Sequence, residues 1–455
     1  MCYSLPAASR DPQPYTGPAK REVLAGRQQF LSPALLMYYR QPVMLVEAEM
    51  QYVWDETGKR YLDAFAGIAS VSVGHCHPHV VDAIREQAEK ILHTSCIYLH
   101  PKMISFAKKL AGTFPADSDL QVSYFTNSGS ESNDLAVLMC RLYTKRFDVI
   151  ALRNGYHGGS QATMALTAMN TWKHQVPHSF GVHFAIPGYC YRCPLGLSYP
   201  SCGVKCAKDV AEVIRYETPG EIACFIAEPI QGVGGVVVPP PEYFQIIYDQ
   251  VRKAGGLCIS DEVQAGLGRT GECFWAFENW GVKPDMVTVA KGIGNGVTLG
   301  AITTRMKVAE RLTDSLHFNT FGGNPVSMSA GLATFEAIEA DQTQKNTERL
   351  GGYIKSKLIE LQNRHPLIGD VRGMGLLLGI ELVKDRETKE PATSEAADVT
   401  ETAKDRGLLL GRSGIDSNII RITPPMCITR DDADFIIDCL DDVIARAEKH
   451  VNNSN

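Results

Sequence analysis

The feature that most constrains this chain is an alternation of short apolar segments with amphipathic segments from about His75 to Pro325. Strands that alternate with helices form a mostly parallel sheet with helices on both faces. We therefore predict an α/β fold. The predicted strands are Val122–Thr126, Val149–Leu152, Ile222–Ala227, Leu257–Ser260, Met286–Ala290 and Leu299–Thr303, and the predicted helices include His79–Leu92, Glu131–Lys145, Glu242–Ala254 and Pro325–Ala340.

The length of 455 residues indicates more than one domain. Residues 1–20 are rich in proline and predict an irregular arm. Residues 21–74 show short strand-like runs from about Phe30, with a hairpin signal at Asp55–Gly58. We predict a large domain over 75–330. A smaller α+β domain over 331–455, with the pattern helix, two or three strands, helix, would be completed by residues 21–74.

Charge and hydropathy exclude several kinds of partner. The formal net charge is −6 and no stretch is strongly basic, so nucleic acid and anionic membranes are poor candidates. The longest apolar runs fall far short of the ~20 residues of a membrane span. The first twenty residues lack both an apolar signal segment and a run of arginines, so we predict a cytoplasmic protein, with the mitochondrial matrix as the alternative.

Charged and aromatic residues stand where the predicted strands end. Lys291, Asp261 and Glu228 each follow or end an apolar strand, and Tyr156 and His157 follow another. Ligands of an open parallel sheet bind beyond the carboxyl ends of its strands. Each residue alone is equally typical of a solvated loop or a structural ion pair, but together they indicate one site.

A fifth strand leads into a turn, Ser128-Gly129-Ser130, at the start of a predicted helix. Ser128 and Glu131 match a capping box, and the backbone N–H groups of a helix N-terminus bind phosphate well. The turn lacks the lysine of a P-loop. Phosphate, a flat ring, an acid and a lysine are the requirements of pyridoxal 5'-phosphate, whose aldehyde forms a Schiff base with lysine and whose ring nitrogen needs a carboxylate.

Beyond these residues, an ordered set of motifs resembles the class III (subgroup II) pyridoxal-phosphate aminotransferases of fold type I, over about Phe30 to Ala447. That resemblance implies a large domain with a mostly parallel, seven-stranded sheet covered by helices. The motifs are "GHCHP" at Gly74–Pro78, "NSGSESND" at Asn127–Asp134, "YHGG" at Tyr156–Gly159, "AEPIQG" at Ala227–Gly232, "SDEVQAGLGRTG" at Ser260–Gly271, "PDMVTVAKGIGNG" at Pro284–Gly296 and "FNTFGGNP" at Phe318–Pro325.

The resemblance also implies roles at the cofactor. Lys291 would form the Schiff base and then move a proton between the substrate Cα and the cofactor, while Asp261 would bind the pyridinium nitrogen. Thr320 would reach the phosphate of a neighbouring subunit, which implies a homodimer with shared sites. The other residues expected at the cofactor are Val263 and Tyr156 on the two ring faces, Gln264 on the phenolic oxygen, Ser128, Gly129 and Ser130 on the phosphate, and Glu228 and His157 near the ring.

Carboxylate recognition separates branches of the family. Arg421 lies where the family keeps an arginine, and in the ornithine and 4-aminobutyrate members a glutamate after "EPIQG" pairs with it. Val233 occupies that place here. A free arginine binds an α-carboxylate in bidentate fashion. Together with the motif spellings, this resembles the alanine–glyoxylate branch, with L-alanine as donor and glyoxylate or pyruvate as acceptor. The alternatives are an ω-amino acid aminotransferase and a phospho-lyase acting on amino-alcohol phosphates.

Two cysteine and histidine patterns suggest metal but are weak. In the class III aminotransferases that the chain resembles, the segment "GHCHPH" is a turn before a helix and not a metal site. The chain has 13 cysteines, which indicates reduced thiols. We predict no metal at the active site, and structural zinc in the loop remains open. The loop cysteines are Cys190, Cys193, Cys202 and Cys206.

Overall fold

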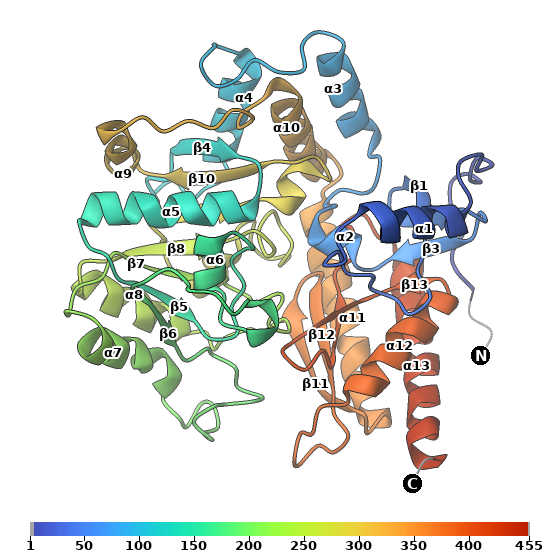
Figure 1. Cartoon of the computed structure of the whole chain (residues 1–455). Coiled ribbons are helices and arrows are strands. Elements are labelled where there is room, and N and C mark those ends of the chain that lie inside the picture. Colours follow the sequence, from blue (N-terminus) through green and yellow to red (C-terminus); the bar gives the residue numbers. More distant parts are fainter. Residues whose placement is uncertain (1–3, 454–455) are drawn as a thin grey trace.

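The computed structural model describes residues 4–453, and in it the chain forms three sheets surrounded by helices (Figure 1). A seven-stranded sheet occupies one side of the molecule, and two four-stranded sheets lie on the other with both chain ends. No helix in this part of the chain is long and apolar enough to cross a membrane.

The seven-stranded sheet has the order β4-β10-β9-β8-β7-β5-β6. Four neighbouring pairs are parallel, and β10 is antiparallel to both β9 and β4. All strands except β10 therefore end at one edge. Their bounds are β4 Val122–Thr126, β5 Val149–Leu152, β6 Val182–Ala185, β7 Cys224–Ala227, β8 Leu257–Asp261, β9 Met286–Val289 and β10 Gly300–Thr304.

Helices cover both faces of this sheet, which explains why β5, β7, β8 and β9 are buried at every position. Alternate residues of each strand face opposite sides. Ile226 and Ile259 pack with the apolar side of α5 (Gly129–Thr144), whereas Phe225 and Cys258 join the cluster of α7 (Lys205–Glu217) and α8 (Tyr243–Lys253).

Other helices surround this layer. Near β4 lie α3 (Pro78–Ala88), α4 (Pro101–Ala111) and α10 (Pro325–Ala340). The shorter ones are α2 Ala66–Ala69, α6 Gln161–Leu166 and α9 Met306–Ala309, with the 3-10 helices η1 Asn170–Trp172, η2 Ala276–Trp280, η3 Lys291–Gly294 and η4 Glu310–Asp314.

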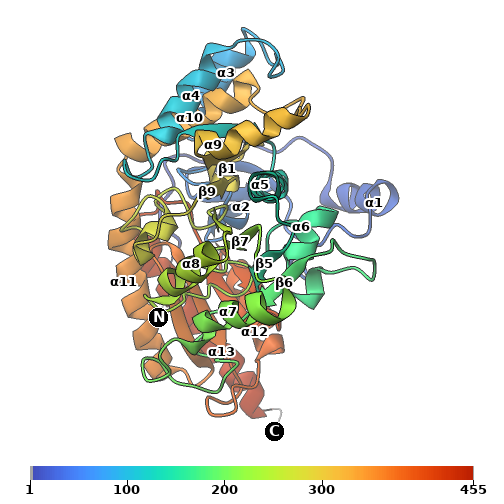
Figure 2. The same cartoon turned by 90° about the vertical axis from the view of Figure 1, so that its left-hand side faces the viewer.

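Of the remaining two sheets, one combines strands from the start and the end of the chain, and the other is built from its last part alone. One has the order β1-β2-β3-β13, and the other, β11-β12-β15-β14, is antiparallel. Helix α1 (Lys20–Phe30) buries no residue and projects from the body in Figure 2. The other bounds are β1 Leu45–Glu49, β2 Tyr52–Asp55, β3 Arg60–Asp63, β11 Ile368–Met374, β12 Leu377–Leu382, β13 Leu408–Leu409, β14 Gly411–Ser413, β15 Ile419–Ile422, α11 Thr343–Arg364, α12 Thr393–Asp405 and α13 Arg430–Asn453.

The predicted α/β fold with a mostly parallel sheet is confirmed, and so is the hairpin, which joins β2 to β3. The sequence analysis missed the edge strand β6 and the helices α1, α4 and α7. It also predicted too few strands after α11, where β11 to β15 and α12 are found. The division at residue 330 stays a prediction, and α10 runs through that position.

Candidate active site

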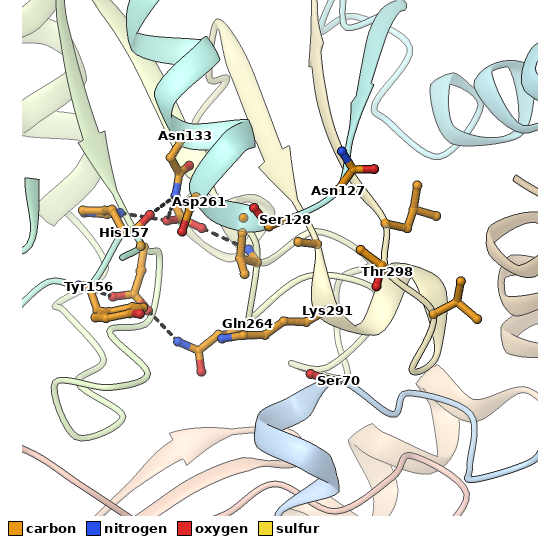
Figure 3. A pocket seen from close by; sticks show the side chains of 18 of the residues that line it. Ser70, Asn127, Ser128, Asn133, Tyr156, His157, Asp261, Gln264, Lys291 and Thr298 are labelled. Atoms are coloured by element: carbon orange, nitrogen blue, oxygen red, sulfur yellow. Dashed lines mark hydrogen bonds and ion pairs between the residues drawn. The ribbon is translucent and has the colours of Figure 1, made fainter. Parts of the chain in front are cut away.

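A cavity of about 330 Å³ lies at the carboxyl edge of the seven-stranded sheet (Figure 3). The connections after β4, β5, β7, β8 and β9 all contribute to its wall. The predicted residues that line it are Ser128, Gly129, Ser130, Tyr156, His157, Glu228, Asp261, Val263, Gln264 and Lys291. The structure thus brings together every predicted cofactor residue except Thr320.

Lys291 follows β9 after one residue, is half-buried and lines the cavity. Its backbone is in the left-handed region, with φ of 51°, a strained conformation that typically costs about 1–3 kcal/mol. Gly292 allows this turn, because a Cβ there would collide with Oγ of Ser72. The pKa of Lys291 is lowered to about 8: burial and then the charge of Arg421 lower it, while Glu228 and Asp261 act to raise it.

Asp261 ends β8 and is held by three neighbours. Nδ2 of Asn133 donates to its Oδ2 at 2.8 Å, and Nδ1 of His157 lies 2.7 Å from the same oxygen. The backbone N–H of Val263 donates to Oδ1 at 3.1 Å. Asn133 in turn accepts a hydrogen bond from Oγ1 of Thr288. The carboxylate is therefore fixed in orientation at the floor of the cavity.

The Ser128-Gly129-Ser130 turn begins α5, two residues earlier than predicted. Oγ of Ser128 caps the helix by accepting from the N–H of Glu131 at 3.1 Å. The reciprocal bond of a capping box is absent from this turn: Oε2 of Glu131 accepts from the N–H of Asn127 instead. Ser128, Gly129 and Ser130 line the cavity, so the start of this helix lies where an anion could bind its N–H groups.

Glu228 directly follows β7 and organises the opposite wall. Its carboxylate accepts from the N–H groups of Tyr156 and Gly232 and from Nε2 of Gln264, at 3.1, 2.9 and 3.3 Å. Burial, and then the nearby charge of Asp261, raises the pKa of Glu228 above its ordinary value. Oε1 of Gln264 has no hydrogen-bond partner among the described residues, so it is available to a bound group.

Arg421 comes from β15 of the smaller antiparallel sheet and is 2% exposed. Its Nε and Nη2 atoms have no hydrogen-bond partner in the described part of the chain. Burial lowers its pKa to about 10, and it lies near enough to Lys291 and Glu228 for their charges to interact. A buried guanidinium without a partner is costly, which indicates an anionic ligand.

Thr320 lies outside the cavity, on an exposed segment between η4 and α10. Large apolar side chains are exposed beside it: Leu316 is fully exposed, and Phe318 and Phe321 are 54% and 62% exposed.

Several cavity residues were missed by the sequence analysis. Asn133 could have been found, because it lies one helical turn after Gly129 and so on the same face of α5. Ser70 and Thr298 carried no local signal. The other residues that line the cavity are Asn127, Gly158, Ala290, Gly296, Val297 and Leu299.

The cavity fits pyridoxal phosphate on its own features. It offers a helix N-terminus, a fixed carboxylate and an amine of lowered pKa. A Cβ on Gly129 would lie 3.1 Å from both methyl groups of Val263. The glycine therefore lets the phosphate-binding turn approach Val263, which is expected to pack against the cofactor ring. By contrast, within residues 4–453 no three His, Cys, Asp or Glu side chains are arranged to hold a metal ion, and this includes the cysteine loop.

The sequence model of the class III aminotransferase family matches residues 37–444, and the chain belongs to this family. It is an aminotransferase. The chain is 49% identical over 437 residues to the Arabidopsis thaliana protein named alanine–glyoxylate aminotransferase 2 homolog 2, mitochondrial, with 96% of this chain and 90% of that protein covered.

Two solved structures are similar over nearly their whole length. One is a Bacillus anthracis aminotransferase, with a TM-score of 0.87, 34% identity, and coverage of 94% of this chain and 98% of that one. The other is a phospholyase from Arthrobacter in complex with phosphoethanolamine, with a TM-score of 0.86, 31% identity, and coverage of 93% and 99%.

Proposed function

We propose that this aminotransferase uses pyridoxal phosphate to transfer the amino group of L-alanine to glyoxylate or pyruvate, in two alternating half-reactions. The observation that carries the proposal is a Lys291 amine of lowered pKa in the cavity wall together with the buried Arg421, whose charge acts on Lys291 and whose Nε and Nη2 atoms have no hydrogen-bond partner among the described residues. The name of the Arabidopsis relative supports the choice of substrates.

The cofactor, when bound, supplies an aldehyde for the amine and an electron-withdrawing ring. Asp261 holds the proton on the ring nitrogen, and its three donors keep its oxygens in place. Ser128 and its neighbours would hold the phosphate, Tyr156 and Val263 would pack against the ring, and Gln264 would hydrogen-bond its phenolic oxygen. Glu228 fixes the backbone of Tyr156 and the side chain of Gln264.

Lys291 acts as the base of the reaction. A lysine with a pKa of about 8 is partly neutral near pH 7, whereas one with an ordinary pKa is almost wholly protonated. The neutral amine would remove the proton from the substrate Cα and deliver it to the cofactor, so that the proton moves with the amino group.

Arg421 binds the α-carboxylate of either substrate. Val233 stands where a glutamate would follow the "EPIQG" segment, so that position supplies no carboxylate to pair with the guanidinium. A bidentate arginine–carboxylate pair in a buried site fixes the substrate strongly. This favours α-amino acids over the ω-amino acids of the alternative.

The active enzyme is proposed to be a homodimer. Thr320 is exposed on its own subunit, and the exposed apolar side chains around it would be buried by a second copy. A partner's Thr320 would then reach the phosphate from across the interface. The mitochondrial name of the relative favours the mitochondrial matrix over the cytoplasm expected from the sequence, and imaging a fluorescent fusion against a matrix marker tests this.

The first experiment is a half-reaction followed by visible absorption. Adding L-alanine without acceptor should convert the band of the lysine-bound cofactor into that of the aminated cofactor, and glyoxylate should restore it. A band that does not change after addition of alanine would refute the proposal that L-alanine is the amino donor. The phospho-lyase alternative, raised by the Arthrobacter structure, predicts release of inorganic phosphate from phosphoethanolamine, which a phosphate assay detects.

A further inference from the structure

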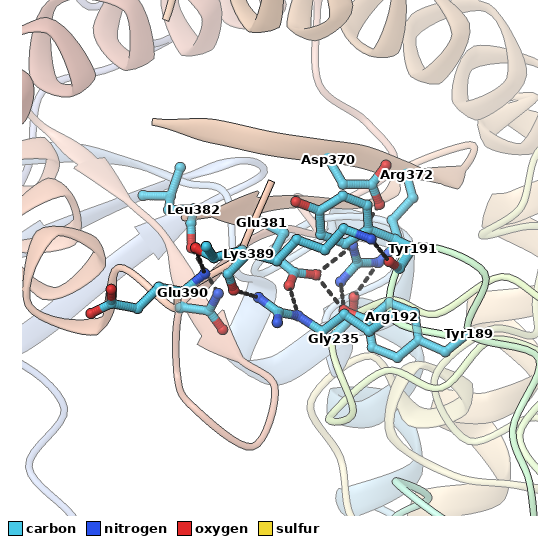
Figure 4. A network of polar contacts seen from close by, with 12 residues as sticks. Tyr189, Tyr191, Arg192, Gly235, Asp370, Arg372, Glu381, Leu382, Lys389 and Glu390 are labelled. Carbon is cyan, nitrogen blue, oxygen red and sulfur yellow. Dashed lines mark hydrogen bonds and ion pairs between the residues drawn. The ribbon is translucent and has the colours of Figure 1, made fainter. Parts of the chain in front are cut away.

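A group of polar side chains outside the lining of the cofactor cavity surrounds one buried carboxylate, that of Glu381 on β12 (Figure 4). Glu381 is completely buried and accepts from the hydroxyl of Tyr189 and from Nε of Arg192, while Nη1 of Arg372 pairs with it at 2.8 Å. Asp370 also pairs with Arg372, at 2.7 Å. The Glu381 cluster is defined here as Tyr189, Arg192, Asp370, Arg372 and Glu381.

The Glu381 cluster joins two parts of the molecule. Tyr189 and Arg192 belong to the cysteine-containing loop after β6, whereas the other members lie on β11 and β12 of the antiparallel sheet. The loop is fastened further because Nη2 of Arg192 donates to the backbone oxygen of Lys389 at 2.7 Å.

The same sheet carries Arg421, and its register places the two buried arginines in one row. Arg372 on β11 lies opposite Gly379 on β12, and Gly379 lies opposite Arg421 on β15. Residues directly opposite in antiparallel strands project to the same face. The two arginine Cα atoms are therefore about 10 Å apart on one face, separated by a residue without a side chain.

The segment from Val233 to Val236 covers this face of the sheet. Nε of Arg372 donates to the backbone oxygen of Gly235 at 2.9 Å. Val236 packs against Gly379, where an added Cβ on the glycine would lie 3.1 Å from the Cβ of Val236. At the other end of the segment, the oxygen of Val233 accepts from the N–H of Gly414. The segment thus lies between the two arginines and is held by one of them.

The two arginines differ in charge balance. Arg372 has two carboxylates and a hydroxyl, whereas the described residues give Nε and Nη2 of Arg421 no hydrogen-bond partner. Although burial acts to raise it, the pKa of Glu381 lies below its ordinary value because of Arg372 and its other donors. The carboxylate is therefore charged, and it neutralises Arg372.

We propose that the Glu381 cluster is a positioning device for substrate binding: by holding Arg372 and the Val233–Val236 segment in place, it leaves Arg421 as the one arginine of the row open to a substrate carboxylate. The inference rests on the proposed role of Arg421. None of these residues is among those that line the cofactor cavity, so the cluster acts on carboxylate affinity through the segment and through Arg421, whose charge interacts with those of Lys291 and Glu228.

The test measures binding of propionate, an unreactive carboxylate, to the full-length holoenzyme by calorimetry, together with KM and kcat for L-alanine. Tyr189→Phe removes one hydroxyl and should weaken propionate binding about threefold. Glu381→Gln removes the charge and should weaken it about tenfold. For both variants KM should rise more than kcat falls, and the visible band of the cofactor should not change.

Tyr191→Phe is the matched control. Tyr191 lies in the same loop, and its buried hydroxyl has no hydrogen-bond partner among the described residues, so this variant should bind propionate like the wild type. If Glu381→Gln does not fold, Tyr189→Phe alone decides. Wild-type propionate affinity in Tyr189→Phe overturns the positioning role.

Arg421→Ala distinguishes a failure of the positioning role from a failure of the proposed substrate site. Loss of propionate binding in this variant with normal binding in the cluster variants refutes the positioning role alone. Normal propionate binding in Arg421→Ala itself shows that the proposed substrate site, and with it this inference, is wrong.

Discussion

Nδ1 of His157 lies 2.7 Å from Oδ2 of Asp261, and both side chains are almost completely buried. Asn133 donates to the same oxygen, so the acid that is expected to meet the cofactor ring has little freedom to turn. Because Asn133 holds this carboxylate in place, we expect its removal to change the affinity of the protein for the cofactor.

Asn133→Ala should weaken binding of pyridoxal phosphate to the apoenzyme at least tenfold. The change removes a hydrogen bond to a charged group, worth about 1.5–3 kcal/mol, and leaves Thr288 without its acceptor. Titration of the apoenzyme with cofactor, followed by absorption, gives the affinity. An unchanged dissociation constant in a variant of normal thermal stability would contradict the role of Asn133.

Reaction of the apoenzyme with added pyridoxal phosphate should depend on pH through Lys291. Only the neutral amine attacks an aldehyde, and the folded-state pKa is lowered to about 8. The rate should therefore be low below pH 7, rise through about pH 8 and level off above it. A stopped-flow profile that continues to rise toward the pKa of an ordinary lysine would contradict this.

Two substitutions should move that midpoint in opposite directions. Arg421 acts to lower the pKa of Lys291 and Glu228 acts to raise it. Arg421→Gln should therefore shift the midpoint to higher pH, and Glu228→Gln should shift it to lower pH. The same stopped-flow profiles measure both, and shifts of equal sign would show that these charges do not act on Lys291.

Gly129→Ala should weaken cofactor binding about tenfold, since the new methyl group lies 3.1 Å from both methyl groups of Val263 and pushes that side chain toward the ring. Gly159→Ala is the matched control, because a Cβ there meets nothing within 4 Å. Equal cofactor affinity in the two variants would be the contrary result.

Shared sites can be tested by mixing two inactive variants. In a heterodimer of Lys291→Ala with Thr320→Asp, one of the two sites receives both native residues. An equal mixture refolded together should regain about a quarter of the wild-type activity, since half of the dimers are mixed. Activity that stays at the level of the separate variants would place Thr320 outside the site.

The sequence predicted the strand ends well and the edges of the structure poorly. Lys291, Asp261 and Glu228 could be placed because each ends a fully buried apolar run abruptly. Strand β6 was missed because it lies at the sheet edge, is only partly buried and contains His183. Helix α1 buries no side chain, so its sequence lacks the apolar stripe from which a helix is predicted.

Other parts of the site depend on contacts that no local pattern records. Ser70 enters the cavity from the region of α2, more than two hundred residues before Lys291 in the chain, and only the packing of the two sheets brings them together. The capping of α5 shows the same limit on a small scale, because Glu131 accepts from the N–H of Asn127 and not from that of Ser128, as a capping box would require.

The antiparallel strand β10 has a consequence for how far the catalytic amine can travel. Because β10 starts at the edge where β9 ends, the chain from Ala290 to Leu299 never crosses the sheet and is tethered at both ends to adjacent strands. Large hinge motions of this connection would break strand pairing. The reach of Lys291 is thus set by rotation about its own side-chain bonds, and lengthening this connection by insertion would loosen it.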